Sequence, residues 1–210
     1  YGRIVHLQPL CWGADGWPQI GQGLNDTGKG QPVSLHRLPA LPVAPCCLQT
    51  SDDFRHGQPG VQWQWQANPQ RHWLTPHQQG LRLRCALTSG DISLYRLPQL
   101  LLQKFPAEEF TATTKLTFTA KQDGEQAGMI VMGWDYSYLS VRKASDKFIL
   151  QQAVCKDAEQ QNPEQVKELA SFPVEYLKMP GVADNEWKTV YLRVKVTKGA
   201  VCTFAYSLNG

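Results

Sequence analysis

The chain has 210 residues, of which 42% are hydrophobic and 19% are charged, proportions that are ordinary for a folded protein. Its net charge is +3, and its 21 Lys and Arg residues are scattered rather than clustered, which argues against nucleic acid as a partner. No apolar stretch approaches the ~20 residues that a membrane-spanning helix needs, so we expect no membrane partner either.

Residues 1–37 are predicted to contain two short strands, over residues 4–7 and 17–20, with a turn over residues 13–16 between them. A glycine-rich hairpin loop is expected over residues 23–30. This loop nearly matches a phosphate-binding motif, but Gly30 replaces the Ser or Thr that would hold magnesium. The segment is too small to bury a core of its own, so we expect it to pack on another body.

Residues 38–51 are predicted to be a linker because Pro39, Pro42 and Pro45 force an extended backbone. Beyond it, over residues 52–210, short apolar runs alternate with Gly, Pro, Asn and Asp, as in a protein built of strands. The predicted strands are residues 61–65, 81–85, 115–120, 127–132, 138–141, 148–150, 191–196 and 201–206. About eight strands with little helix favour two packed sheets.

Three details of this region can be tested against the structure. Strict alternation places Val61, Trp63 and Trp65 on one strand face, where core packing is favoured over a sugar-stacking platform. The nearly continuous apolar run over residues 127–132 predicts a central strand that is covered on both faces. Residues 163–170 are a helix candidate capped by Asn162, although a strand is favoured for their second half.

Two segments resemble the C-terminal part of family 43 glycoside hydrolases. Residues 2–12 (GRIVHLQPLCW) and 16–21 (GWPQIG) are similar to the closing strands of the catalytic propeller. Residues 60–65 (GVQWQW) resemble the first strand of the sandwich that follows it in β-xylosidases and α-L-arabinofuranosidases. Further similar stretches are residues 68–69, 101–106, 127–133 and 191–194.

The resemblance implies an all-β fold. Residues 52–210 would form a concanavalin A-like jelly-roll β-sandwich, incomplete at its C-terminus, and residues 1–37 a short remnant of a five-bladed β-propeller. The parent protein would be an inverting hydrolase of xylosides or arabinosides, with plant-polysaccharide-derived oligosaccharides as ligands. Its catalytic carboxylates lie in earlier blades, so no catalytic residue is expected here and the chain alone should be inactive. The sandwich would stabilise the upstream propeller, its partner, and shape the active site.

The alternative is a stand-alone, non-catalytic carbohydrate-binding module. The first 35 residues separate the two hypotheses, because a free-standing module has no use for an isolated blade edge that contains Trp12 and Trp17. A second copy of the chain is kept as a candidate partner. The sequence does not identify a compartment, with a bacterial periplasmic or secreted location slightly favoured over a cytoplasmic one.

Three residues are candidate substrate contacts. Arg3 matches a family arginine that points into the sugar-binding subsite, and a guanidinium offers fixed, charged donors to a sugar hydroxyl; a structural arginine is the alternative. Trp134 and Tyr136 flank Asp135 at a predicted strand end, where exposure is expected. Their aromatic faces could stack on pyranose rings, so we interpret both as candidate carbohydrate contacts.

No metal or other cofactor is expected in this chain, and the resemblance places calcium only in the missing propeller. His72, His77 and Cys85 are potential metal ligands, but the spacing of the two histidines and the proline between them favour surface loops. The six cysteines contain no CxxC pair, so mostly free thiols are expected, with Cys85 and Cys202 acting as small hydrophobes in strands. The carboxylate pairs at residues 52–53 and 108–109 are interpreted as solvated turn charges.

Overall fold

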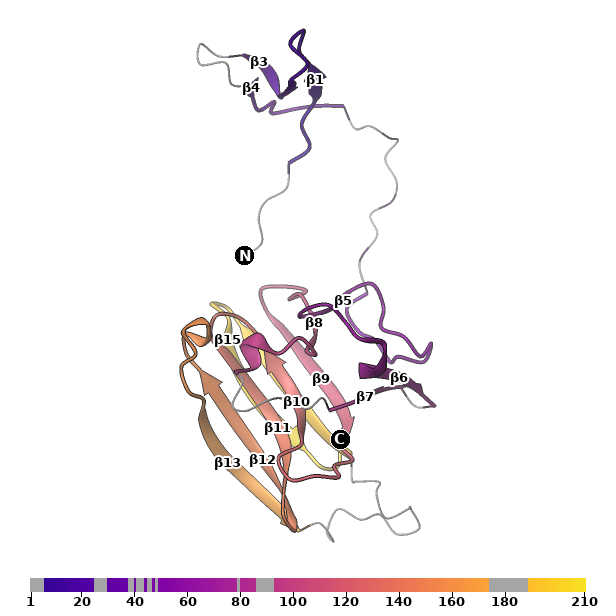
Figure 1. The fold of residues 1–210 in the computed structure, drawn as a ribbon, viewed down its shortest axis with the longest axis vertical. Coiled ribbons are helices and arrows are strands. Elements are labelled where there is room, and N and C mark those ends of the chain that lie inside the picture. The colour runs from indigo at the N-terminus through magenta and orange to yellow at the C-terminus, as the bar shows by residue number, and fades with distance from the viewer. Residues whose placement is uncertain are drawn as a thin grey trace. The chain divides into compact units, whose positions relative to one another are not determined.

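The computed structural model describes residues 6–24, 30–37, 40, 44, 47, 49–78, 80–85, 93–173 and 189–210. The chain divides into two compact units, Tyr1–Cys47 and Leu48–Gly210, as Figure 1 shows. The division falls within residues 38–51, the stretch that contains three prolines. Within the described residues, no helix is long and apolar enough to cross a membrane.

The first unit contains two antiparallel pairs of short strands. β1 (Leu10–Trp12) pairs with β2 (Pro18–Ile20), and β3 (Gln22–Leu24) pairs with β4 (Gly30–Gln31). The predicted turn between β1 and β2 is confirmed, and so is the β3–β4 hairpin, although residues 25–29 lie outside the described residues. The strand predicted over residues 4–7 is not formed at His6 and Leu7, the two of its residues that are described.

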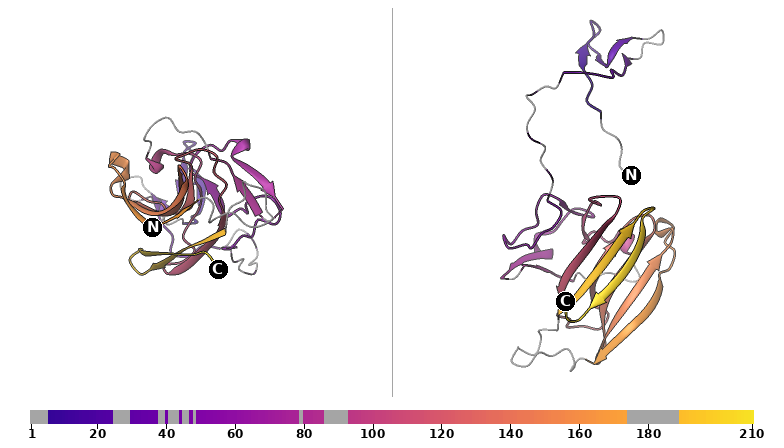
Figure 2. Two further views of the ribbon diagram at one scale, coloured as in Figure 1. Left: turned by 90° about the horizontal axis from the view of Figure 1, so that it is seen from below. Right: turned by 180° about the vertical axis from the view of Figure 1, so that it is seen from behind.

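The second unit is a two-layer β-sandwich, seen end-on in the left panel of Figure 2. One antiparallel sheet has the order β10-β11-β12-β13, formed by Gln126–Val131, Tyr136–Ala144, Lys147–Cys155 and Gln165–Pro173. The other has the order β15-β14-β9, formed by Val201–Ser207, Thr189–Thr197 and Phe110–Thr117. This architecture confirms the predicted all-β sandwich.

Smaller elements flank the sandwich. β5 (Trp63–Trp65) pairs with β8 (Leu101–Gln103), and β6 (Leu74–His77) pairs with β7 (Gly80–Leu83). The helical elements in the described part of the chain are short 3₁₀ turns: η1 (Arg71–Trp73), η2 (Leu94–Arg96) and η3 (Ala158–Gln160).

The core lies between the two sheets and follows from strand alternation. β11 directs Leu139 and Val141 inward, and β14 contributes Leu192, which is fully buried. Phe118 and Phe148 meet edge to face there, with ring centroids 5.9 Å apart, an arrangement that aromatic pairs prefer. The remaining buried members of this cluster are Ala120, Leu150 and Val190.

Two strand predictions need correction. β10 is an edge of its sheet rather than a central strand; its two faces are nevertheless covered, because Met129 packs on the inter-sheet core and Ile130 on a second cluster outside it. Residues 165–170 belong to strand β13, so the helix candidate was wrong and the strand interpretation of its second half was correct.

The aromatic side chains near β5 are only partly as predicted. Val61 lies before the first residue of β5, so it does not share a strand face with the tryptophans, and it is 96% exposed. Trp63 and Trp65 are half-buried and pack on the rings of Phe54 and Trp73, at centroid distances of 5.4 and 5.5 Å. The two tryptophans therefore hold small aromatic clusters together outside the inter-sheet core.

Asp52 is not the solvated turn charge that was expected. Its half-buried carboxylate accepts hydrogen bonds from the backbone N–H groups of Phe54 and Gly60, both at 2.9 Å, and from the indole Nε1 of Trp63 at 3.1 Å. Burial opposes ionisation, but these hydrogen bonds outweigh it and lower the pKa of Asp52. Asp52 thus organises the loop that leads into β5.

Candidate functional site

The candidate site begins at the β10–β11 hairpin, where Trp134 is 75% exposed. The hairpin is tied to the connection between β12 and β13. Asp135 forms an ion pair with Lys156 at 2.7 Å and accepts a hydrogen bond from the Asp157 N–H at 2.9 Å. The Ala158 N–H donates to the carbonyl of Trp134 at 2.8 Å. The backbone that carries the exposed indole is therefore fixed to the β12–β13 connection.

The pKa values of Asp135 and Lys156 agree with an ion pair between the hairpin and the β12–β13 connection. The hydrogen bond from Lys156 lowers the pKa of the Asp135 carboxyl, and the same contact raises the pKa of Lys156. Both groups are therefore charged across the ordinary pH range, and Asp135 directly follows the exposed Trp134 in the sequence. An exposed indole next to fixed polar groups can stack on an apolar sugar face while donors and acceptors meet the sugar hydroxyls.

Tyr136 lies behind this hairpin and is only 2% exposed, so the expectation that it is accessible was wrong. The reason is strand alternation: Tyr136 and Tyr138 both point away from the inter-sheet core, onto the outer face of the sheet. There they pack with Ala153, Cys155 and Ala158, and with partly buried apolar residues from neighbouring segments: Leu94, Tyr95, Ile130 and Met132.

A single carboxylate joins the two tyrosines. The hydroxyls of Tyr136 and Tyr138 donate to the two carboxylate oxygens of Glu164, each at 2.6 Å. Their rings are stacked, with centroids 6.4 Å apart. The Tyr136 oxygen also accepts from the Leu94 N–H and contacts the Ser93 hydroxyl, both at 3.3 Å, which fixes η2 against the sheet.

Burial, and then the hydrogen bond to Glu164, raises the pKa of both Tyr136 and Tyr138 above the ordinary value. Both phenols therefore remain protonated donors at any physiological pH. Their donor capacity is used within the protein, so this cluster fixes η2 and the β12–β13 connection.

The outer face continues as a row of polar side chains. Arg142 Nε donates to Gln151 Oε1 at 3.2 Å, and Gln151 Nε2 donates to Gln126 Oε1 at 3.3 Å. Beside them, the buried hydroxyl of Ser140 has no hydrogen-bond partner in the described part of the chain. Sequence analysis missed this row and Glu164, although the alternation from Tyr136 to Arg142 could have shown which side chains share a face.

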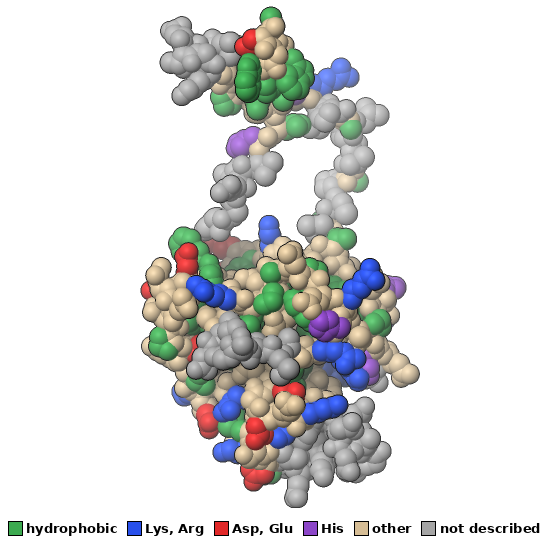
Figure 3. Space-filling model, in the orientation of Figure 1, with side chains coloured by type: hydrophobic (Ala, Val, Ile, Leu, Met, Phe, Trp, Pro, Cys, Tyr) green, Lys and Arg blue, Asp and Glu red, His purple; other side chains and the backbone are tan. Residues whose placement is uncertain are grey.

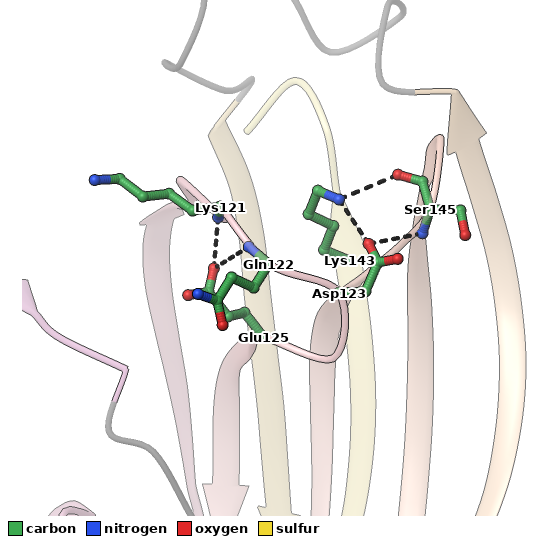
Figure 4. Close-up of polar contacts among 6 residues, drawn as sticks. All are labelled: Lys121, Gln122, Asp123, Glu125, Lys143 and Ser145. Atoms are coloured by element: carbon green, nitrogen blue, oxygen red, sulfur yellow. Dashed lines mark hydrogen bonds and ion pairs between the residues drawn. The ribbon is translucent and has the colours of Figure 1, made fainter.

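The opposite end of the sandwich is also tied, as Figure 4 shows. Asp123 Oδ1 accepts from Lys143 Nζ at 2.6 Å and from the Ser145 N–H at 2.9 Å. Glu125 accepts from the backbone N–H groups of Lys121 and Gln122 at 2.6 and 3.2 Å. The hydrogen bond from Lys143 lowers the pKa of Asp123. These carboxylates cap loops, so we assign this end a structural role.

The remaining candidate residues that the structure describes lie in or beside three different elements. Arg3 lies outside the described residues. His72 is in η1, His77 ends β6 and Cys85 follows β7; among the described residues, no group of three or more His, Cys, Asp or Glu could hold a metal ion.

Four cysteines in the described ranges are free thiols, namely Cys11, Cys85, Cys155 and Cys202. Cys85 is exposed, so it is not the buried small hydrophobe that was expected. Cys155 is fully buried and donates its S–H to the Asn162 carbonyl at 3.2 Å.

Comparison with known proteins identifies relatives of this chain. The chain is 38% identical over 87 residues to a beta-xylosidase of Formosa agariphila, covering 40% of this chain and 14% of that protein. It is 28% identical over 138 residues to a non-reducing end alpha-L-arabinofuranosidase of Bacteroides ovatus, covering 65% of this chain and 25% of that protein. The chain therefore spans a quarter or less of the length of these two relatives.

A crystal structure of a GH43 protein from Bacillus licheniformis matches 97% of this chain and 35% of its own, with a TM-score of 0.57 and 22% identity. This likeness shows the fold. The family model described as the beta-xylosidase C-terminal concanavalin A-like domain matches residues 51–210, and the chain therefore belongs to that family of glycoside hydrolase family 43 domains.

Proposed function

We propose that this chain is the C-terminal part of a glycosidase that hydrolyses xylosides or arabinosides of plant polysaccharides with inversion. The names of the two relatives support this substrate class. An inverting mechanism needs two carboxyl groups roughly 6.5–9.5 Å apart, one to protonate the leaving oxygen and one to activate water. We place that pair on a propeller that precedes this chain, so the 210 residues alone are inactive.

The exposed apolar surface of the first unit carries this proposal. None of its described side chains is buried, and the two large residues Trp12 and Trp17 are 71% and 73% exposed. Figure 3 shows hydrophobic side chains gathered on this unit. Large apolar patches mark surfaces that another body covers. The strand pairs β1–β2 and β3–β4 are, in this proposal, the closing edge of the propeller.

The sandwich, in contrast, has its own packed core and needs no catalytic group for its stability. We propose that it stabilises the propeller and shapes the active site, and that further strands complete it at its C-terminus. Arg3 would reach into the sugar-binding subsite from the propeller edge. Its guanidinium suits a sugar hydroxyl because its donors are fixed and always charged.

The test is hydrolysis of nitrophenyl β-D-xyloside and α-L-arabinofuranoside by the full-length protein and by the 210-residue chain. We expect turnover by the full-length protein alone, with the inverted anomer as the first product in NMR spectra. Arg3→Ala in the full-length protein should lower kcat/KM, with Arg37→Ala, a second arginine of the same unit, as the matched control. Turnover by the short chain would refute the proposal, because its catalytic pair would then lie among the loop carboxylates.

A stand-alone carbohydrate-binding role is the second candidate, and the exposed indole of Trp134 favours it. The 210-residue chain should then be retarded in gels that contain xylan or arabinoxylan. Trp134→Ala should abolish the retardation, whereas Trp17→Ala, which removes an equally exposed indole from the other unit, should preserve it. Equal mobility of all three proteins would reject this role for Trp134.

A further inference from the structure

The outer face of the three-stranded sheet β15-β14-β9 is the feature from which we draw a further inference. Along each strand, every second side chain points away from the inter-sheet core. The three strands contain Lys115, Arg193 and Lys195 but no Asp or Glu. All three basic side chains are exposed and lie at outward positions. The right panel of Figure 2 shows β9 beside the two yellow strands β14 and β15.

The strand register places these three residues, which we call the basic strip, close to one another. Arg193 and Lys195 are two residues apart on β14, and Lys115 lies opposite Tyr191 of the same strand. Four residues of a strand span about 13 Å, so the basic strip has this length. Among the described residues, no carboxylate forms an ion pair with any of the three. Their positive charge is therefore available to a ligand.

Threonine hydroxyls surround the basic strip. Arg193 Nε donates to the hydroxyl of Thr113 at 3.0 Å, which orients the guanidinium and leaves its terminal N–H groups without a partner in the part of the chain that the structure describes. A threonine hydroxyl both donates and accepts hydrogen bonds, as a sugar hydroxyl does. The outward threonines of the three strands are Thr111, Thr113, Thr117, Thr189, Thr197 and Thr203.

A shallow depression adjoins one end of the basic strip. Its volume is about 330 Å³, and Thr111 and Lys195, which are paired in register, contribute to its lining. Glu109 also lines it, and its carboxylate accepts a hydrogen bond from the Lys198 N–H at 3.0 Å. This end offers a donor and acceptors to a neutral sugar ring. Repulsion from Glu109 directs a ligand carboxylate towards the Arg193 end.

We propose that the basic strip binds a polysaccharide chain that carries carboxylates, as uronic acid groups provide. Lys and Arg form charge-assisted hydrogen bonds with carboxylates, and the threonines meet the neutral hydroxyls between them. The polysaccharide class rests on the proposed function, whereas the acidic character of the ligand rests on the charge of this face. The strip lies on the sheet opposite to the one that carries Trp134, so it is a second carbohydrate surface.

The spacing and chemistry of the face favour this ligand over nucleic acid or protein. A DNA duplex carries one negative charge per about 1.7 Å, which is much denser than three cations over about 13 Å. The core of a protein interface is apolar, whereas the outward positions here hold mainly hydroxyl and basic side chains. Uronic acid groups, in contrast, are spaced along a chain of neutral sugars.

An NMR titration of the isotope-labelled 210-residue chain tests the proposal. The ligand is a xylo-oligosaccharide with a glucuronic acid branch, and the matched ligand is the same molecule with its carboxyl group reduced to an alcohol. We expect amide shifts in β9 and β14 with the acidic ligand, weakening as salt screens the exposed charges. Equal shifts with both ligands, or shifts confined to the other sheet, would overturn the proposal.

Neutralising the basic strip gives the corresponding test on the protein. Because exposed ion pairs are individually weak, the triple variant should raise the Kd about tenfold in total. The control variant removes the same charge at exposed positions of β7, β12 and β13 and should leave the Kd unchanged. Equal losses in two variants of unaltered Tm would show that net charge, not this face, binds the ligand. The test variant is Lys115→Gln, Arg193→Gln, Lys195→Gln, and the control is Arg82→Gln, Lys147→Gln, Lys167→Gln.

Competitors separate the classes of ligand. Displacement of the acidic oligosaccharide by polyglutamate or by duplex DNA at equal charge concentration would identify a protein or nucleic acid partner and overturn the proposal. Binding is measured without hydrolysis, so the two proposals fail separately. A full-length protein that hydrolyses the nitrophenyl glycosides but does not bind the acidic ligand at this face refutes the basic strip alone. Binding by a full-length protein without glycosidase activity refutes the proposed function alone.

Discussion

Replacing Glu164 tests whether one carboxylate holds the outer face of the sandwich together. Glu164→Ala removes the acceptor of two 2.6 Å hydrogen bonds. Tyr136 keeps its contacts with Ser93 and Leu94, and the buried hydroxyl of Tyr138 loses its 2.6 Å acceptor and keeps only its contacts with the side chains of Gln126 and Gln151. Hydrogen bonds to charged groups contribute about 1.5–3 kcal/mol each, and an unsatisfied buried hydroxyl costs about 1–3 kcal/mol.

We therefore expect Glu164→Ala to lower the free energy of unfolding by roughly 3 kcal/mol, which corresponds to a fall in Tm of about 6–12 °C for a chain of this size. Thermal and urea unfolding of the 210-residue chain measure both quantities. Glu168→Ala, at an exposed position of β13, is the matched control and should change stability by less than about 0.5 kcal/mol. Equal effects of the two substitutions would show that the carboxylate does not hold the tyrosines.

The same cluster predicts a dependence on alkaline pH. Because the pKa values of Tyr136 and Tyr138 are raised in the folded protein, the unfolded chain loses these two protons first as the pH rises. Their stabilising contribution is complete below the ordinary tyrosine pKa near 10 and is lost as the pH rises towards the raised values. The slope reaches about 1.4 kcal/mol per pH unit for each tyrosine. Urea midpoints between about pH 9 and pH 11 should therefore fall more steeply than those of a Tyr136→Phe, Tyr138→Phe variant.

Three further substitutions test other parts of the fold. Leu192→Ala should lower the free energy of unfolding by about 2–5 kcal/mol because the side chain is fully buried between the sheets, whereas Leu169→Ala, at a partly exposed position, should have a much smaller effect in the same urea titration. Asp52→Ala should shift tryptophan fluorescence to the red, because Trp63 loses its indole partner; an unchanged spectrum would contradict the role given to Asp52. Asp123→Asn should accelerate hydrogen exchange in the β11–β12 turn, and because the pKa of Asp123 is lowered, the difference from the unaltered protein should vanish as acid protonates its carboxylate.

The sequence predicts where the strands lie better than it predicts which strands pair with one another. Alternation and apolar runs locate β10 and β14 within a few residues, because side-chain burial depends on local period. The apolar run of β10 nevertheless predicts a central strand, since periodicity reports that both faces are covered and says nothing about which strand lies beside it. The position of β10 at a sheet edge is a property of the pairing order, which is set by contacts distant in sequence.

The candidate site shows the same limit. Exposure at a strand end was correctly expected for Trp134 and wrongly expected for Tyr136, because the cover over Tyr136 comes from η2, more than 40 residues away in the sequence. Glu164 was not identified, since its role depends on which strand face it approaches. Asp52 was interpreted as a turn charge for a similar reason: its partner Trp63 is 11 residues away.

The fully buried thiol of Cys155 is a natural probe for local opening of the outer face of the sheet, so no label has to be introduced. Its sulfur lies among Tyr136, Tyr138 and Ala158 and donates to the Asn162 carbonyl, so a thiol reagent can reach it only while this cluster is open. The rate of its modification, measured against the exposed Cys85, reports the population of that open state. The modification rate of this natural cysteine thus measures how often the cluster of Tyr136, Tyr138 and Glu164 opens.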